Sequence, residues 1–162
     1  LSEYLGGAAT IPSGVLVGSM LLAPSHGISA LDLSSDLAEI PMLWRSRALS
    51  PATASPIVMD NAVFVVNRAG VLTRGSLEGG RREWQLRLKG PFSASAVGFG
   101  TVQYWVNEKG LLQVVDVAQG EGTVVSQLDL DQQVLGTPSI ANGGLYIRSD
   151  STLWKIGKAP IL

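Results

Sequence analysis

The chain has 162 residues, of which 46% are hydrophobic and 15% are charged, and it carries a formal net charge of −1. A charged share below the ~25% of an ordinary soluble domain favours a surface partly covered by other protein, and the lack of a basic stripe argues against an electrostatic nucleic-acid site. The absence of cysteine excludes disulfides, thiolate catalysis and cysteine-based zinc sites, and no apolar run approaches the ~18 residues of a membrane-spanning helix.

The sequence repeats itself about every 40 residues, a period typical of propeller blades and other repeat folds. Ungapped copies start at Ser55, Ser95 and Thr137, and a further copy precedes them from Ser13. In each copy a short apolar run and a turn lead into a stronger strand, for which β-branched and aromatic residues are typical.

The second predicted strand of each copy, such as Ala62–Val66, is followed by a short polar loop that usually ends in glycine. Glycine accepts a positive φ at little cost, so this loop predicts a hairpin. A third strand and, after another turn, an outer strand complete the copy. The last copy stops at its third strand, Leu153–Gly157.

Four short strands per ~40 residues predict an all-β chain built of propeller blades. One four-stranded sheet cannot cover both of its faces, whereas stacked sheets bury the near-continuous apolar strands. A β-sandwich is the alternative, although it would not produce this register between copies. We therefore expect a single propeller segment over residues 1–162, a C-terminal arc of about 3.5 blades at 10–50, 51–90, 91–133 and an incomplete 134–158.

Parts of a spaced motif follow the third strands, with glycine four residues and tryptophan eight residues beyond an aspartate position. The residues that carry it are Asp32 and Trp44 in the first copy, Ser76, Gly80 and Trp84 in the second, and Asp116, Gly120 and Val124 in the third. Trp44 comes after an insertion, and Val124 replaces tryptophan. In these positions the chain resembles the pyrroloquinoline-quinone-type β-propeller repeat, and the resemblance implies that the motif docks neighbouring blades against each other.

The family that the chain resembles includes quinone-dependent dehydrogenases and the non-enzymatic propeller lipoprotein of bacterial outer-membrane β-barrel assembly. The resemblance favours a non-catalytic protein-interaction or scaffold module of the bacterial cell envelope or periplasm, without a cofactor. Its partners would be other proteins or further blades of a longer parent chain. The alternative is part of an alcohol or sugar dehydrogenase that uses pyrroloquinoline quinone (PQQ) and Ca²⁺, although the sequence has no acidic cluster suited to Ca²⁺.

Single residues that could carry chemistry have simpler structural interpretations. His26 is the only histidine, and it lacks the nearby ligands that a metal site needs. Asp32 and Asp116 could act as acid–base groups, but their matched positions favour turns in which a carboxylate accepts backbone N–H bonds. Trp44 and Trp84 could stack on carbohydrate, but packing between blades also accounts for them. We expect no catalytic or metal-binding residue.

The loops between second and third strands are the better candidates for binding. Propeller topology puts these loops on one rim with the connections between blades, and loops on a rigid scaffold commonly carry function. The alternative is a solvated rim without a partner. The candidate rim residues are His26, Arg68, Glu108, Lys109 and Asp150.

Overall fold

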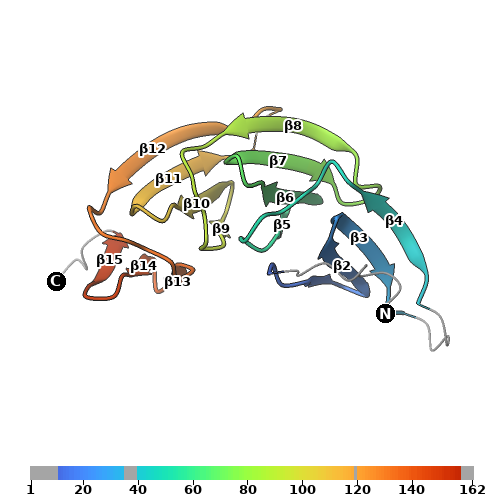
Figure 1. The fold of residues 1–162 in the computed structure, drawn as a ribbon, viewed down its shortest axis with the longest axis horizontal. Coiled ribbons are helices and arrows are strands. Elements are labelled where there is room, and N and C mark those ends of the chain that lie inside the picture. The colour runs from blue at the N-terminus through green and yellow to red at the C-terminus, as the bar shows by residue number, and fades with distance from the viewer. Residues whose placement is uncertain (1–10, 35–39, 119, 158–162) are drawn as a thin grey trace. The chain divides into compact units, whose positions relative to one another are not determined.

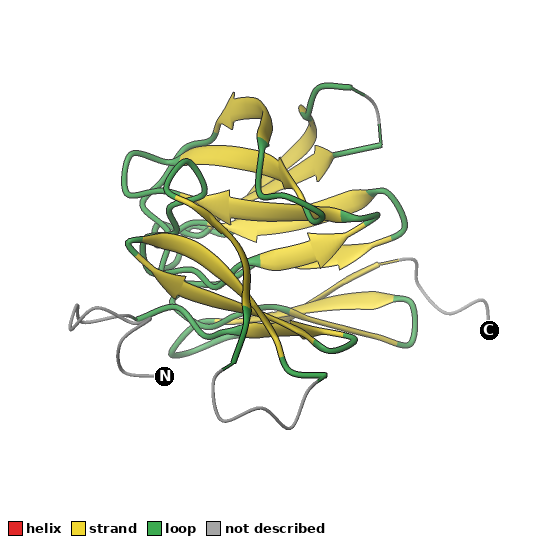
Figure 2. Ribbon diagram, turned by 90° about the vertical axis from the view of Figure 1, so that its right-hand side faces the viewer, coloured by secondary structure: helices red, strands yellow, loops and turns green. Residues whose placement is uncertain are grey.

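The computed structural model describes residues 11–34, 40–118 and 120–157. This part of the chain consists of strands joined by turns and loops and contains no helix (Figure 2), so the all-β prediction is confirmed. No helix that could cross a membrane is therefore found within these ranges. The chain divides into two compact units, Leu1–Leu88 and Lys89–Leu162.

The first unit contains two antiparallel sheets of four strands, and in each sheet the strand order follows the chain (Figure 1). Neighbours in sequence are therefore neighbours in space. The first sheet consists of β1 (Val15–Val17), β2 (Met20–Ser25), β3 (Gly27–Asp32) and β4 (Met42–Ser46). The second sheet consists of β5 (Ile57–Met59), β6 (Ala62–Val66), β7 (Val71–Ser76) and β8 (Arg82–Arg87).

The second unit contains a third sheet of four strands and a fourth sheet with three described strands. The third sheet consists of β9 (Val97–Phe99), β10 (Val102–Val106), β11 (Leu111–Asp116) and β12 (Thr123–Asp129). The fourth consists of β13 (Ser139–Ala141), β14 (Gly144–Arg148) and β15 (Leu153–Gly157). Residue 158, the last of the fourth predicted blade, lies outside the described residues.

Each unit is held together by side chains from both of its sheets. The two cores are formed by Leu22, Ile28, Ala30, Leu49, Val63 and Val65 in the first unit, and by Ala94, Val106, Leu112, Val134, Leu145 and Ile147 in the second. All five residues of β6 are buried, which is the reason for its uninterrupted apolar sequence. Val63 and Val65 face the first sheet, while Phe64 packs against Trp84 of its own sheet with ring centroids 5.8 Å apart.

A β-bulge recurs at one position in three sheets. The register between the third and fourth strands shifts after Ala30, after Arg74 and after Val114. The residues opposite these three positions are Trp44, Trp84 and Ser126. Counting along the sequence put Val124 in the tryptophan position of the third copy. That assignment is wrong, because Val124 lies opposite Val115, and the chain from Val115 to Val124 is two residues longer than the chain from Gly75 to its partner Arg82.

The indole of Trp44 joins the two sheets of the first unit. Its Nε1 donates a hydrogen bond of 3.0 Å to the carbonyl of Leu77, in the turn that follows β7. The ring lies against Gly80 of the same turn, where a Cβ atom would come within 2.5 Å of Trp44 Cε3. By contrast, the Nε1 of Trp84 is buried without a hydrogen-bond partner among the described residues.

The aspartate positions of the motif lie in the turns that lead to the outer strands. Asp32 Oδ1 accepts a hydrogen bond of 2.9 Å from the backbone N–H of Ser34, and Asp116 Oδ1 accepts one of 2.9 Å from Ala118. The pKa of Asp32 is lowered, mainly by the hydrogen bond from the backbone N–H of Ser34 and to a smaller extent by nearby hydroxyl groups. At Gly120, the third-copy position that corresponds to Gly80, an added Cβ atom would meet no other atom within 4 Å.

Candidate binding cleft on the first unit

Two tight connections bring His26 and Arg68 to the same end of the first unit. β2 and β3 join directly around His26, with Ser25 and Gly27 paired. Gly27 has a φ of +119°, and a Cβ atom on it would lie 2.2 Å from the carbonyl oxygen of Ser46. This position therefore admits only glycine. The adjoining His26 side chain is exposed to solvent.

The loop that carries Arg68 is fixed by the side chain of Asn67. Its Oδ1 accepts hydrogen bonds of 3.0 Å from the backbone N–H groups of Ala69 and Val71. Gly70 completes the turn with a φ of +77° and donates to the Asn67 carbonyl at 2.9 Å. An asparagine that bonds its own loop in this way rigidifies it, and Arg68 is left exposed at the tip.

Between these connections lies a cleft of about 590 Å³, within the ~300–1,000 Å³ of typical ligand pockets. His26 and Arg68 both line it, together with the segment that connects the first sheet to the second. The lining includes neutral polar groups and apolar walls but no carboxylate: Ile11, Pro12, Pro24, Ser25, His26, Ser50, Pro51, Ala52, Thr53, Asn67, Arg68 and Ala69.

Sequence reasoning missed the part of this cleft contributed by the connection between the sheets. Ser50, Pro51 and Thr53 line the cleft but do not belong to a loop between second and third strands. The signal was present in the sequence, because a serine-proline pair in the segment after an outer strand is typical of a loop, and the connections between blades share the rim with those loops.

The other rim candidates lie in the second unit and differ in exposure and contacts. Asn107 forms the same loop as Asn67, accepting from Lys109 and Leu111 at 2.9 Å. Lys109 is exposed at its tip, whereas Glu108 is half-buried and accepts a 2.8 Å hydrogen bond from the Ser93 hydroxyl. Glu108 therefore has a structural contact of its own.

Asp150 is exposed in the loop between β14 and β15. The buried Ser149 hydroxyl beside it bonds Gln132 Oε1 at 2.6 Å, which ties that loop to the segment before β13. Of the five predicted rim residues, the cleft of the first unit thus brings together His26 and Arg68.

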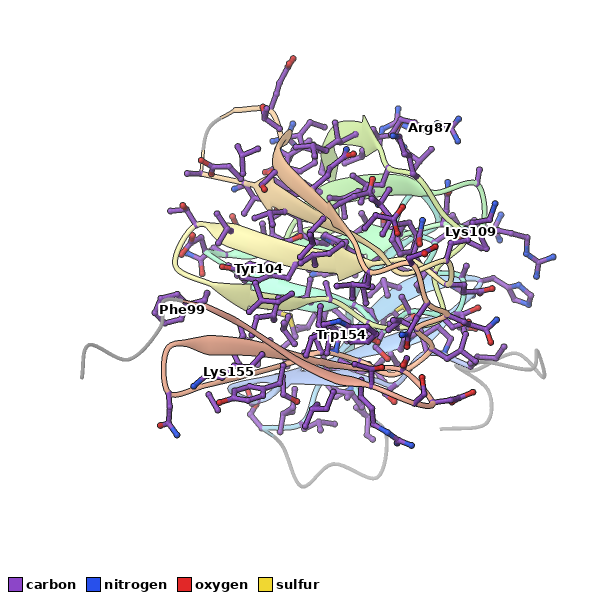
Figure 3. All side chains as sticks on the ribbon, turned by 90° about the vertical axis from the view of Figure 1, so that its left-hand side faces the viewer. Arg87, Phe99, Tyr104, Lys109, Trp154 and Lys155 are labelled. Carbon is purple, nitrogen blue, oxygen red and sulfur yellow. The ribbon has the colours of Figure 1, made fainter. Side chains whose placement is uncertain are left out.

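The second unit has a larger and more apolar cleft of about 950 Å³ between its two sheets. Leu112, Val114, Leu145 and Ile156 contribute apolar walls, and Ser126 lines it where the other two sheets have tryptophan. Tyr104 lies on the adjoining strand β10, and Phe99 projects from the end of β9 and is 69% exposed (Figure 3). The small Ser126 side chain leaves open the space that an indole would fill.

No group of three or more histidine, aspartate or glutamate side chains that could hold a metal ion occurs among residues 11–34, 40–118 and 120–157. These residues therefore do not fit the Ca²⁺ ion that a quinone-dependent dehydrogenase requires, and no reaction step through the quinone can be derived from them.

Neither a protein family model nor a curated protein matches this sequence. Among solved structures, BamB from Moraxella catarrhalis is similar over 94% of this chain, with a TM-score of 0.71 and 16% sequence identity. The chain covers 45% of BamB, so it spans less than half of that protein's length. The computationally designed Ika4 protein is similar over 94% of this chain and 96% of its own length, with a TM-score of 0.65 and 12% identity.

The fold is that of a partial β-propeller. BamB is a PQQ-like propeller lipoprotein, so the resemblance to propellers of that type is confirmed at the level of the fold. At 16% and 12% identity the similarity carries no information on activity, because one fold supports many functions.

Proposed function

We infer that this chain is a non-catalytic protein-interaction module and that the cleft of the first unit takes part in binding its partner. The observation that carries this inference is the meeting of His26, Arg68 and the Ser50–Thr53 segment around one cleft. The loops that form the cleft are fixed by Asn67, Gly27 and Gly70. A site on rigid loops binds without a large entropic cost of ordering.

A location in the bacterial cell envelope is part of the same proposal. It is supported by the resemblance to the propeller lipoprotein of outer-membrane β-barrel assembly and by the structural similarity to BamB. The partners are other proteins or further blades of the same protein. Fractionation of cells that express the protein from its own gene tests the location, and recovery in the cytosolic fraction would contradict it.

Site-specific photo-crosslinking tests the interaction surface. A photoreactive amino acid replaces Arg68 at the cleft or, as a matched control, Arg81, which is exposed in the turn at the opposite end of the second sheet. We expect a discrete adduct of one mass from position 68 and none from position 81. Equal adducts from both positions, or none from position 68, would refute a binding role for the cleft.

The same proposal states that the protein needs no cofactor. Addition of PQQ and Ca²⁺ to the full-length protein, followed by a dye-linked assay of alcohol oxidation, tests this directly. We expect no oxidation and no absorbance change of bound quinone. Turnover in this assay would refute the interaction module and show that the protein is a dehydrogenase.

A further inference from the structure

We propose that the cleft end of the first unit binds an extended acidic segment of a protein, whose carboxylates contact the arginine side chains around the cleft. The proposal rests on the proposed function and names the chemistry of the partner. It comes from the distribution of charge along the strands of this unit.

The two ends of the first unit differ in charge. The end that carries the cleft is where β2 joins β3, where β6 joins β7 and where β4 and β8 finish. The charged side chains there are arginines. In order along the chain they are Arg45, Arg47, Arg68 and Arg87, and His26 lies among them.

The described carboxylates of the first unit gather toward the opposite end. They are Asp32 at the end of β3, Asp60 in the β5–β6 turn, Glu78 in the β7–β8 turn and Glu83 near the start of β8. Glu83 is also paired with Arg74 at 2.7 Å. Within the described residues of the first unit, the cleft end therefore has arginine charge without a neighbouring carboxylate.

The register of the strands places these arginines close to the cleft-forming loops. Ser46, which precedes Arg47, pairs with Ile28, two residues beyond His26. Arg87 pairs with Val71, and its guanidinium donates a hydrogen bond to the carbonyl of Ala69, beside Arg68. Arg87 is thereby held against the loop that lines the cleft, and the Arg68 side chain beside it is exposed.

Like charges held at one end of a rigid unit repel one another, and a carboxylate-bearing ligand relieves this repulsion. Arginine is suited to the task because its planar guanidinium binds a carboxylate through two parallel hydrogen bonds. The neutral walls of the cleft, including Pro24, Pro51 and Ala52, offer apolar contact to the uncharged side chains of an extended segment. The arginine charge and the apolar walls of the cleft therefore suit a peptide that carries both carboxylates and uncharged side chains.

A nucleic acid is less well matched to this surface. Phosphate backbones are bound by cations that continue along a groove or stripe, whereas here Arg68 lines the cleft and Arg87 contacts its loop. The remainder of the chain brings the formal net charge to −1. We therefore commit to a protein partner and treat binding of single-stranded DNA as an outcome that would overturn the proposal.

The test measures fluorescence polarisation of a short labelled peptide of alternating glutamate and alanine, with the full chain as the receptor. The peptide with glutamine in place of glutamate is the ligand control. We expect saturable binding of the glutamate peptide that weakens as ionic strength rises, because exposed charge pairs are screened over ~8 Å at physiological salt. Equal binding of the glutamine peptide would overturn the proposal.

Two charge-reversed variants test whether the peptide binds at the cleft end of the first unit. Arg68→Glu should weaken binding about tenfold, whereas Arg81→Glu, which makes the same change in net charge at the opposite end, should change it less than about twofold. Both side chains are exposed, so neither variant should alter the melting temperature. Equal losses in the two variants would mean that net charge alone drives binding and would refute the site.

The outcomes separate this proposal from the proposed function. A crosslinked partner at position 68 without binding of the glutamate peptide would leave the interaction module intact and reject the acidic ligand. Tighter binding of single-stranded DNA than of the peptide, lost in Arg68→Glu, would assign the cleft to nucleic acid instead.

Discussion

Trp44 and Gly80 form a contact between two sheets that tolerates no added atom. The indole lies on the glycine so closely that a Cβ atom there would be 2.5 Å from Cε3 and 2.6 Å from Cζ3. Gly80 also has a φ of +65°. The contact and the backbone conformation therefore both require glycine at this position, for independent reasons.

Replacement of Gly80 by alanine should lower the free energy of unfolding by at least about 2 kcal/mol, since strain at positive φ adds to displacement of a packed ring. Gly79→Ala is the matched control, because open space surrounds its Cβ position, and it should change stability by less than about 0.5 kcal/mol. Urea unfolding of the full chain measures both. Similar losses in the two variants would show that the Trp44 contact is unimportant for stability.

The hydrogen bond from Trp44 Nε1 to the Leu77 carbonyl, 3.0 Å long, can be measured against a natural control. Trp44→Phe and Trp84→Phe remove the same atoms, but the Trp84 Nε1 is buried without a described hydrogen-bond partner. We expect Trp44→Phe to cost about 1–2 kcal/mol more than Trp84→Phe, because it leaves the Leu77 carbonyl without that donor. An equal or greater cost for Trp84→Phe would contradict this assignment.

Asn67 and Asn107 form equivalent loops but differ in one contact. Asn107 Nδ2 donates to the carbonyl of Lys89 at 2.9 Å, and Asn107 is only 3% exposed. Aspartate retains the acceptor that each loop needs but lacks this donor. Asn107→Asp should therefore lose about 2 kcal/mol or more, and Asn67→Asp less than about 1 kcal/mol.

The pH dependence distinguishes the two variants further. A buried carboxylate facing the Lys89 carbonyl has a raised pKa, so the loss in Asn107→Asp should shrink as the pH falls and that carboxyl becomes protonated. Chemical unfolding at neutral pH and near pH 5 measures the effect. A loss that is the same at both pH values would show that the buried charge is not its cause.

Asp32 should contribute a small acid-dependent part of the stability. The N–H of Ser34, and then hydroxyl groups nearby, lower its pKa in the folded chain. The ionised form is therefore favoured by folding, so this stability is present above the unfolded-state pKa and is lost as the pH falls through the lower folded-state pKa. Asp32→Asn should reduce the steepness of acid unfolding below about pH 4. An unchanged acid profile would refute the contribution.

The elements that sequence reasoning identified best were those with short-range causes. The alternation of apolar runs with Asn-x-x-Gly loops predicted the second and third strands, because Asn67 and Asn107 determine their loops through contacts only two and four residues away. The fold class follows from this repetition. A four-stranded unit with apolar faces on both sides requires stacking, whatever its neighbours are.

Features that depend on pairing between strands were not predictable by counting residues. The bulges after Ala30, Arg74 and Val114 leave no signature in the local sequence. The tryptophan position of the third copy was misplaced by two residues, because the chain from Val115 to its partner Val124 is two residues longer than the chain from Gly75 to Arg82. The cleft depends on how two sheets stack, and the separation of charge in the first unit depends on strand direction. Both become visible only when the register is known.

Ser126 offers a direct test of the interpretation of the second cleft. It lies where the first two sheets have tryptophan, and it lines a cleft of about 950 Å³ with Leu112, Val114 and Ile156. Ser126→Trp should raise the free energy of unfolding by about 1 kcal/mol, because ~25 cal/mol is gained per Å² of apolar surface buried and part of this offsets the ordering of the side chain.

Val125→Trp is the matched control for the second cleft. Val125 is 56% exposed and does not line the cleft, so an indole at this position is not expected to fill it. We expect no gain from this variant in the same unfolding assay. Ser126→Trp must not lower the free energy of unfolding, nor leave it equal to that of Val125→Trp. Either result would show that the space beside Ser126 does not accommodate an indole and that the three bulges correspond in backbone pairing but not in side-chain packing.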